Sequence, residues 1–427
     1  MTDTQHTKIQ REVATGTLSQ TAADLQDERL IRNEGLGGAV QSFFGRVRRG
    51  DLGQLPVIIG LIVIWAIFTV LNPTFLSADN LSNLVQEMTP TGIIALGIVL
   101  VLLLGQIDLS VGSVSGLASA VVGVLAVQVG MPYLVAILIA MAVGVLIGLL
   151  YGFLFIRFGV PSFVITLAGL LGFLGIQVWI LGANGSINIP FQSWFTQFAF
   201  AWFLPPWVAY LLAALAGGSI LYGDLMRARR RHAAGLSTTA LSITLVKAIS
   251  LAVVLAFVAW YFSTSRGTGV MFTLFVVLVV LFDYLLIRTR WGRSIYAVGG
   301  NVEAARRAGI RVNWVFISVF MLCSFLAATG GILQTAYGQS ANLQSGTGDV
   351  NLDAIAAAVI GGTSLFGGRG RAWSALLGII VIFSITSGLN LLNLNSAARY
   401  VITAIVLLLA VIVDSLSRRS RAAHGQA

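Results

Sequence analysis

The chain has 427 residues, of which 57% are hydrophobic and 10% charged, and its formal net charge is +10. Because soluble domains carry about 25% charged residues, this composition excludes a soluble fold of this size and predicts an all-α polytopic membrane protein. The positive charge does not indicate nucleic-acid binding, since it lies in segments that flank apolar runs. A single cysteine and three scattered histidines give no set of metal ligands and allow no disulfide within the chain.

Residues 1–50 are polar and charged, and we expect them to form a cytoplasmic tail without a signal peptide. Near its end, Val40, Phe43, Phe44 and Val47 recur at helical spacing beside arginines. This pattern is typical of a helix that lies in the membrane interface. A plain basic flank to the first span explains the same residues equally well.

Twelve apolar runs long enough to cross a bilayer follow, within a transmembrane domain at 51–417. The predicted spans are 55–72, 88–106, 111–129, 132–156, 160–182, 199–222, 238–262, 269–287, 313–337, 350–366, 373–392 and 397–416. The tenth is the shortest, and Gly361 and Gly362 could break it, so a half-helix that lines a protein-enclosed cavity is the alternative. Residues 418–427 are expected to form a second cytoplasmic tail.

Glycine is frequent, at 47 of 427 residues, and it recurs inside the apolar runs. The segments 142-AVGVLIGLLYG-152 and 168-AGLLGFLG-175 carry small residues at spacings of three and four. Small residues let membrane helices approach closely, so we expect both segments to pack tightly against neighbouring helices.

The distribution of Lys and Arg predicts the orientation of the spans. With the N-terminus in the cytoplasm, nearly all of these residues lie on the cytoplasmic side, as the positive-inside rule requires. The outer segments hold only Arg266 and Arg399, and Lys247 lies within a span. An even number of crossings, with both termini in the cytoplasm, is therefore favoured.

The sequence also indicates which chemistry this chain does not perform. Its two lysines, Lys8 and Lys247, do not follow a glycine, so it contains no GxxxxGK[ST] phosphate-binding loop. We expect the chain not to be an enzyme and not to hydrolyse ATP by that route.

Ionisable residues near the middle of spans would indicate an ion-coupled carrier, but the candidates lie toward span ends. Asp108, Asp283, Asp353 and Lys247 are interpreted as caps, snorkelling groups or members of ion pairs in preference to an ion relay. Asp108 and Ser110 are placed where the second and third spans meet, on the cytoplasmic side. They are candidates for a gate or, with more weight, for a cap of the third span, and Asp353 is a further gate or helix-junction candidate.

The cytoplasmic segment 288-RTRWGRSIYAVGGNVEAARRAGIRVNW-314 is longer than a connector requires. Gly299 and Gly300 predict a turn, and Asn301 is a good helix cap. The stretch 302–309 is alanine-rich, has Glu303 early and Arg306 and Arg307 late, and ends in Gly309, which predicts a short helix on the inner membrane face. A basic loop with incidental helix is the competing interpretation.

This segment resembles the coupling loop of ribose/xylose/galactose-type permeases of bacterial ABC sugar importers. The matching residues are Thr289, Gly292, Arg293, Ala297, Gly299, Gly300, Asn301, Glu303, Ala304, Ala305 and Gly309. Two further blocks, 105-GQIDLSVGSVSG-116 and 352-LDAIAAAVIGGTSLFGGRG-370, resemble other signatures of the same family in the same order. Gln106 departs from the pattern, because the family usually has glycine there.

The family plan has ten spans of the type II-like importer kind, and this chain has an additional pair within 190–265. Such long variants are similar to the xylose and multiple-monosaccharide branch. The resemblance implies that the chain is the transmembrane permease subunit of an importer in the bacterial inner membrane, passing xylose or a related monosaccharide.

The resemblance also implies partners: an ATPase subunit that binds ATP and Mg²⁺, a periplasmic or extracellular sugar-binding protein, and a second copy of the permease. The coupling loop, 288–312, would dock the ATPase through Gly292, Arg293, Gly299, Gly300, Asn301, Glu303, Ala304, Ala305, Arg306 and Gly309. Arg293 could instead anchor the loop to lipid headgroups. The alternatives for the whole chain are an ion-coupled secondary sugar carrier and a structural or signalling subunit without a pathway.

The resemblance does not locate the sugar site. Polar residues in or near spans, Gln177, Asn184, Asn390 and Asn393, are candidates to contact sugar hydroxyls. We favour hydrogen bonds between helices as their role.

Overall fold

The computed structural model describes residues 54–394, except 237 and 239, and a few positions between 397 and 408. The expected N-terminal tail with its interfacial helix, most of the predicted span 397–416 and the tail 418–427 lie outside the described residues. The described part divides into two compact units, a larger one and a smaller one within 205–263. Among the described residues, nine helices are long and apolar enough to cross a membrane, and the 17-residue helix α4 is a shorter apolar helix.

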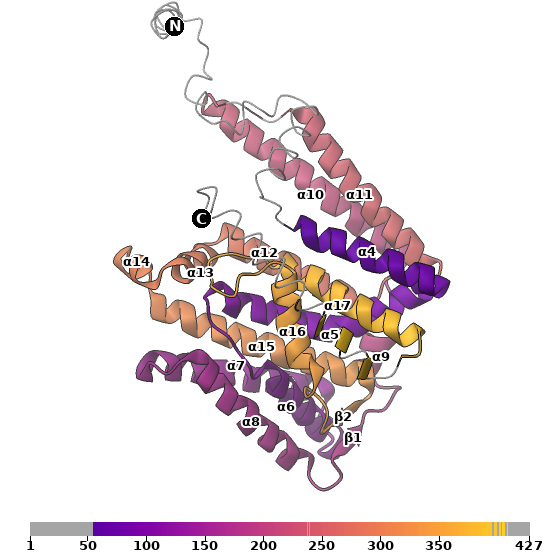
Figure 1. Cartoon of the computed structure of the whole chain (residues 1–427), viewed down its shortest axis with the longest axis vertical. Helices are drawn as coiled ribbons and strands as arrows, with labels where there is room; N and C mark the ends of the chain where they lie inside the picture. The colour runs from indigo at the N-terminus through magenta and orange to yellow at the C-terminus, as the bar shows by residue number, and fades with distance from the viewer. Residues whose placement is uncertain are drawn as a thin grey trace, which may run out of the picture. The chain divides into compact units, whose positions relative to one another are not determined.

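The larger unit is almost entirely helical (Figure 1). Its elements are α4 (Leu55–Leu71), a 3-10 helix (Pro73–Leu76), α5 (Ala78–Leu103), α6 (Val111–Gly123) with a π-helical end (Val124–Gln128), α7 (Tyr133–Phe158), α8 (Ser162–Leu181), β1 (Ser186–Asn188), α9 (Trp194–Phe200), α12 (Val270–Arg288), α13 (Arg290–Gly300), α14 (Val302–Arg307), α15 (Val312–Gly338), β2 (Ser340–Asn342), α16 (Asp349–Ile360) and α17 (Trp373–Leu391). The two strands pair antiparallel, with Ile187 opposite Ala341. This pairing places the ends of α8 and α15 at the same end of the bundle, as the charge distribution predicts.

Helix α15 lies at the centre of this unit, with α5, α6 and α7 packed along it (Figure 1). Glycines allow the close approach: a Cβ on Gly148 of α7 would lie 2.3 Å from the carbonyl oxygen of Phe320, and one on Gly144 would lie 2.7 Å from that of Ser324. The predicted tight packing of 142–152 is thus confirmed. The prediction fails for Gly172 and Gly175 of α8, where a Cβ would meet no described atom within 4 Å.

Helix α5 begins ten residues before the predicted span at 88–106. The added residues include Ser82 and Gln86, which are polar and buried. A hydropathy pattern assumes that polar residues lie outside the membrane core, but here they face other helices. Gln86 donates a hydrogen bond from Nε2 to the carbonyl oxygen of Ala199 in α9, at 3.3 Å.

Helix α6 begins halfway along α15 instead of beside the first turn of that helix. After α5, the chain turns at Gly105 and runs back in non-helical conformation to residue 110. Along α6, Ser119 and Thr335 of α15 share a hydrogen bond of 2.5 Å, and Gly123 packs on Ala341. The start of α6 therefore lies near the level of Cys323, in the middle of α15.

Helix α16 also begins partway along α15, but its chain direction is opposite to that of α6. After β2 the chain runs back along the bundle toward the start of α6, where Gly346 packs on Gly112. There the side chain of Asn351 donates a hydrogen bond to the carbonyl oxygen of Leu109, at 2.5 Å. The 12 residues of α16 span about 18 Å, less than the hydrocarbon core of about 30 Å. The predicted span 350–366 is therefore too long, and the shorter helix, which ends before Gly361, agrees in length with the half-helix alternative.

The smaller unit is a hairpin of α10 (Pro206–Ala233) and α11 (Leu241–Ser263). It packs through small residues, because a Cβ on Gly217 would lie 2.7 Å from the carbonyl oxygen of Ala248. The predicted span 199–222 was misplaced, because α10 begins at Pro206 and continues to Ala233. Helix-forming residues and an ion pair of 2.8 Å between Asp224 and Arg227 stabilise this extension.

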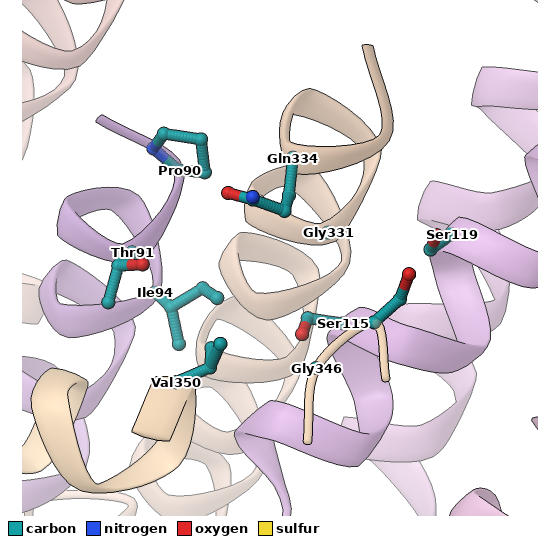
Figure 2. Close-up of a pocket in the computed structure, with 10 residues that line it drawn as sticks. Pro90, Thr91, Ile94, Ser115, Ser119, Gly331, Gln334, Gly346 and Val350 are labelled. Carbon is teal, nitrogen blue, oxygen red and sulfur yellow. The ribbon is translucent and has the colours of Figure 1, made fainter. Parts of the chain in front are cut away.

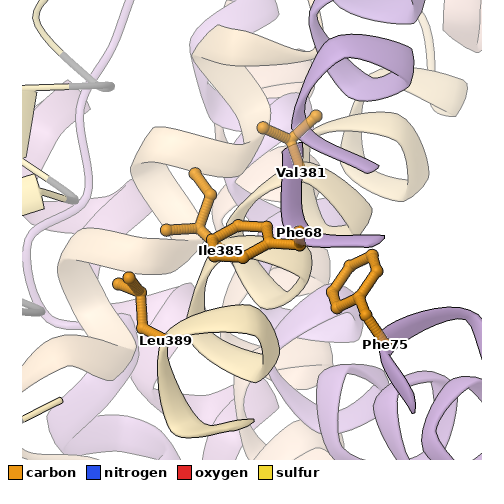
Figure 3. Close-up of a cluster of buried hydrophobic side chains, with 5 residues drawn as sticks. All are labelled: Phe68, Phe75, Val381, Ile385 and Leu389. Carbon is orange, nitrogen blue, oxygen red and sulfur yellow. The ribbon is translucent and has the colours of Figure 1, made fainter. Parts of the chain in front are cut away.

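Helix α4 and the 3-10 helix pack on α17 through five buried apolar residues (Figure 3). They are Phe68, Phe75, Val381, Ile385 and Leu389. Trp65 adds a hydrogen bond from its indole nitrogen to the hydroxyl of Ser384, at 2.8 Å. This cluster joins α4, the first described helix, to α17.

We predict that Gly148→Ala destabilises the protein and that Gly172→Ala does not. A methyl group on Gly148 would press on the backbone of α15, and overpacking of this kind costs about 1–3 kcal/mol. Thermal unfolding of the detergent-solubilised protein should show a melting temperature several degrees lower for the first variant. Equal melting temperatures for the two variants would contradict the central role of the α7–α15 contact.

Candidate coupling site at one end of the bundle

Two helices, α13 and α14, form the predicted coupling segment at the end of the bundle where α5 ends and α15 begins. Helix α13 starts at a Thr289 cap, whose hydroxyl accepts a hydrogen bond from the amide of Gly292 at 3.1 Å. A Cβ on Gly292 would lie 2.2 Å from the carbonyl oxygen of Leu286, so only glycine fits this turn. The sequence pattern predicted one short helix, and α13 was missed, although its cap Thr289 and the apolar pair Ile295 and Val298 indicate a helix there.

Gly299 and Gly300 do not form the predicted turn, because they are the last residues of α13. Gly299 is needed for another reason. A Cβ there would lie 1.8 Å from the carbonyl oxygen of Leu103 and 2.8 Å from the amide of Gly368. Its role is to let the backbones of α5, α13 and the 361–371 loop meet.

Helix α14 confirms the predicted short helix and both of its ends. The side chain of Asn301 accepts a hydrogen bond from the amide of Ala304 at 2.9 Å. At the other end, Gly309 has a φ of 80°, and the amide of Ile310 reaches back to the carbonyl oxygen of Ala305, which is a Schellman stop. Local sequence therefore determines this helix.

The two faces of α14 differ in exposure. Ala305 is buried, whereas Glu303, Ala304, Arg306 and Arg307 are exposed. Glu303 and Arg306 form an ion pair of 3.3 Å that is open to solvent, so it contributes little to stability. Exposed charges held on a short, doubly capped helix are available to a partner.

A cavity of about 560 Å³ lies beside α14, between the last turn of α7 and the first turns of α15. Gln106, Arg306 and Asn313 supply polar groups to its wall, and Phe155 and Phe316 supply apolar ones. Gln106, the residue that departs from the family pattern, thus faces the coupling segment. Arg293 is exposed on α13.

Two hydrogen bonds attach the coupling segment to the rest of the larger unit, and a third attaches the 361–371 loop to α5. The indole nitrogen of Trp291 donates to the hydroxyl of Ser318 in α15 at 2.9 Å, and the hydroxyl of Tyr296 donates to the carbonyl oxygen of Gly370 at 2.9 Å. The amide of Gly368 donates to the carbonyl oxygen of Leu103 at 2.8 Å. Burial, reinforced by the nearby carboxylate of Asp283, raises the pKa of Tyr296, so its hydroxyl remains a donor at neutral pH.

The 361–371 loop is also tied to α12. Arg371 lies 3.9 Å from the carboxylate of Asp283, whose side chain is 18% exposed. Asp283 is therefore a member of an ion pair, as interpreted from the sequence. The loop contacts α13 through Tyr296 and joins α16 to α17 along the chain.

Asp108, Ser110 and Asp353 do not join the coupling site. The prediction that placed Asp108 and Ser110 at the cytoplasmic end was wrong, because the chain doubles back at Gly105 and carries them to the middle of the bundle. There the carboxylate of Asp108 accepts hydrogen bonds from the amide and hydroxyl of Ser110, at 2.8 and 2.7 Å, and shapes the turn before α6. Tyr151 of α7 donates to the Ser110 hydroxyl at 2.8 Å.

Asp353 lies in the second turn of α16, remote in sequence and position from α14.

Of the polar residues considered for sugar contact, Gln177 is fully buried. Its side-chain amide donates to the carbonyl oxygens of Asn342 and Ser345, at 3.0 and 2.9 Å. It thus joins α8 to the segment after β2, which agrees with the favoured role in bonding between helices and segments.

Known proteins resemble the chain over most of its length. A family model described as "Branched-chain amino acid transport system / permease component" matches residues 80–411. The xylose transport system permease protein XylH of Escherichia coli strain K12 is 35% identical over 378 residues, which cover 88% of this chain and 95% of that protein. The ribose import permease protein RbsC of the same strain is 34% identical, covering 84% and 92%. No solved structure matches the chain significantly.

We predict that Gly299→Ala loosens α13 and that the adjacent Gly300→Ala does not. The first substitution drives a methyl group into the carbonyl group of Leu103, whereas a Cβ on Gly300 would meet no described atom within 4 Å. Limited trypsin digestion at the exposed Arg293 should be several-fold faster in the first variant than in wild type. Identical digestion of both variants would show that the three-backbone contact does not hold the helix.

Proposed function

The chain belongs to the permease family that matches its residues 80–411, and on that premise we propose that it is the membrane-spanning subunit of an ABC importer for a monosaccharide. The observation that carries the proposal is similarity to sugar-transport permeases along nearly their whole length. This similarity speaks against an ion-coupled carrier and against a subunit without a pathway.

The substrate class rests on the relatives and not on the family description, which names amino acids. The xylose and ribose permeases are 35% and 34% identical to the chain, a difference too small to choose between pentoses. The additional hairpin of α10 and α11 favours the xylose branch. We therefore propose xylose or a related monosaccharide, delivered by a binding protein at the outer end.

The energy comes from a partner ATPase that holds ATP and Mg²⁺ and docks on α13 and α14. A negative charge on Glu303 and positive charges on Arg306 and Arg307 face this partner. The caps at Asn301 and Gly309 fix the two ends of α14. A partner can shift a permease between two states only if it binds those states with different affinity. A segment capped at both ends and fixed to three parts of the bundle transmits such a difference, which a floppy loop would not.

The protein is multi-pass in the inner membrane, and we propose that the coupling end faces the cytoplasm. Arg157, Arg288, Arg369 and Arg371 lie at this end, in agreement with the positive-inside rule. Both termini are then cytoplasmic, and β1 and β2 face the binding protein.

Glu303→Lys should uncouple ATP hydrolysis from uptake without preventing membrane insertion. In vesicles with the ATPase and binding protein, we expect sugar uptake and sugar-stimulated hydrolysis to fall at least tenfold. A charge-swapped variant, Glu303→Lys with Arg306→Glu, keeps the ion pair within α14 but reverses the charges offered to the ATPase. If the swap restored uptake, the pair would be needed only within the helix and the docking role would fail.

Tyr296→Phe should weaken the transmission of motion from the coupling segment to the bundle, while the ATPase should still dock. It removes the hydroxyl that donates to Gly370 but retains the ring. We expect normal co-purification with the ATPase and a several-fold drop in sugar moved per ATP hydrolysed. Tyr284→Phe, on the exposed side of α12, is the matched control and should behave as wild type. If Tyr296→Phe moved as much sugar per ATP hydrolysed as wild type, this contact would have no role in coupling.

A further inference from the structure

The cavity beside α14 lies at the depth where acyl chains give way to lipid headgroups. Helix α7 has 26 residues and spans about 39 Å, which exceeds the hydrocarbon core of about 30 Å. Gly148 packs on Phe320, and two turns later Phe155 lies against Phe316, with ring centroids 4.7 Å apart. The last turn of α7 therefore reaches a membrane surface beside the first turns of α15, and the cavity lies between them.

An exposed apolar stripe of α7 ends in an arginine at the rim of this cavity. Leu146, Leu150 and Phe153 recur at helical spacing and are exposed, as expected of side chains that face acyl chains. Arg157 is exposed one turn further along the same stripe. Its neighbour Ile156 lines the cavity, so the stripe changes from apolar to cationic at the cavity rim.

An exposed tryptophan marks the same depth on α15. Trp314 is 59% exposed, and tryptophan is enriched where a membrane helix passes from hydrocarbon to headgroups. The adjacent Asn313 is exposed and lines the cavity, and Arg311, the residue before α15, is exposed as well. Both helices therefore place the cavity at the boundary between acyl chains and headgroups.

The wall of the cavity has a polar part and an apolar part. Arg306 contributes a guanidinium group, and Gln106 and Asn313 contribute amides, all of which can donate hydrogen bonds to phosphate oxygens. The other lining residues are apolar: Phe155, Ile156, Val302, Val312 and Phe316. Helix α14 has one carboxylate, Glu303, which pairs with Nη1 of Arg306. With Arg157 and Arg311 nearby, the described rim carries a net positive charge.

A second hollow in the larger unit shows how different this cavity is (Figure 2). Thr91 of α5, Ser115 of α6 and Gln334 of α15 line that hollow, and none of its lining residues is charged. Its volume is about 10 Å³, which is enough for one water molecule. The volume of about 560 Å³ beside α14 falls within the range of about 300–1,000 Å³ that is typical of ligand sites.

We propose that the cavity beside α14 binds the headgroup of an anionic glycerophospholipid. The lipid phosphate accepts hydrogen bonds from Arg306, Gln106 and Asn313, and the first part of an acyl chain covers Phe155 and Phe316. Basic pockets between transmembrane helices at a membrane surface recognise lipid headgroups in this way. A soluble phosphate compound would leave the apolar part of the wall uncovered, whereas a lipid covers both parts.

This inference goes beyond the proposed transport function, because it assigns a second ligand to the chain. A lipid bound between α7, α14 and α15 would hold α14 against the bundle. The position of the coupling segment would then depend on the anionic lipid content of the membrane.

Photo-cross-linking of the purified full-length chain in mixed lipid and detergent micelles tests the site. The probe is phosphatidylglycerol that carries a photoactivatable diazirine near the start of one acyl chain, and mass spectrometry locates the cross-linked peptides. We expect cross-links within 155–156 and 312–316, and excess unlabelled phosphatidylglycerol should displace them. The matching phosphatidylcholine probe should label these segments at least fivefold less, and equal labelling would overturn the selectivity for anionic lipid.

Glycerol 3-phosphate distinguishes a lipid from a soluble phosphate compound. It offers the same phosphate group without acyl chains, so an excess should leave the labelling unchanged. If it displaced the phosphatidylglycerol probe, the cavity would be a site for a soluble phosphate ligand, and the lipid assignment would be wrong.

Asn313→Asp tests the contribution of the cavity wall. It replaces an amide by a carboxylate of the same shape, whose charge repels a phosphate, so we expect at least fivefold less labelling. Asn313→Gln keeps the amide and should label within twofold of wild type. Gln192→Glu is the matched control, because Gln192 is exposed beside the exposed aromatic residues Phe191 and Trp194 at the opposite end of the bundle. It adds the same charge away from the cavity and should label as wild type does.

Wild-type labelling of Asn313→Asp would refute the lipid site. The assay contains no ATPase, sugar or binding protein. Its failure would therefore leave the proposed function standing, and the outcome of the Glu303→Lys experiment does not affect it.

Discussion

Close backbone contacts along α15 hold the larger unit together, because lipid gives membrane helices little hydrophobic reason to associate. Gly97 of α5, Gly144 and Gly148 of α7 and Gly331 within α15 each bring a helix against the main chain of its neighbour. Contacts with main-chain atoms cannot be relieved by a rotamer change. The position of α15 is thereby fixed relative to the helices around it.

Because these helices are fixed, the neighbouring helices α6 and α16 can begin partway along α15, each after a non-helical stretch. The turns before α6 and α16 leave main-chain groups at mid-depth, and they are satisfied by Asp108, Asn351 and Gln177, each reaching from a different element. The coupling segment lies at the end of this group of helices where α5 ends and α15 begins. The 361–371 loop contacts α13 and leads into α17 from the end of α16, so it is the part of the bundle that would pass a displacement of the coupling segment on to these helices.

Local signals in the sequence predicted α14 well, because Asn301 and Gly309 act on their own helix. They did not predict α13, whose position depends on the distant Ser318 and Gly370. The early start of α5 was missed because its polar residues are buried by other helices, a fact that hydropathy alone cannot reveal. The depth of Asp108 was wrong for a similar reason: the reversal at Gly105 is a single residue, but its consequence is set by contacts with α15. Most apolar spans were placed within a few residues, since their length is imposed by the bilayer itself.

The junction of Gly299, Gly105 and Gly367 has a consequence for adapting the protein to other ATPases. Main-chain atoms fill this point, and no side chain is present whose replacement could tune it gradually. Under the proposed docking role, variation that changes the choice of ATPase would fall on the solvent-facing residues of α14, while the glycine junction behind it stays constant. Exchange of those few residues would then leave the main-chain contacts of Gly299, Gly105 and Gly367 intact.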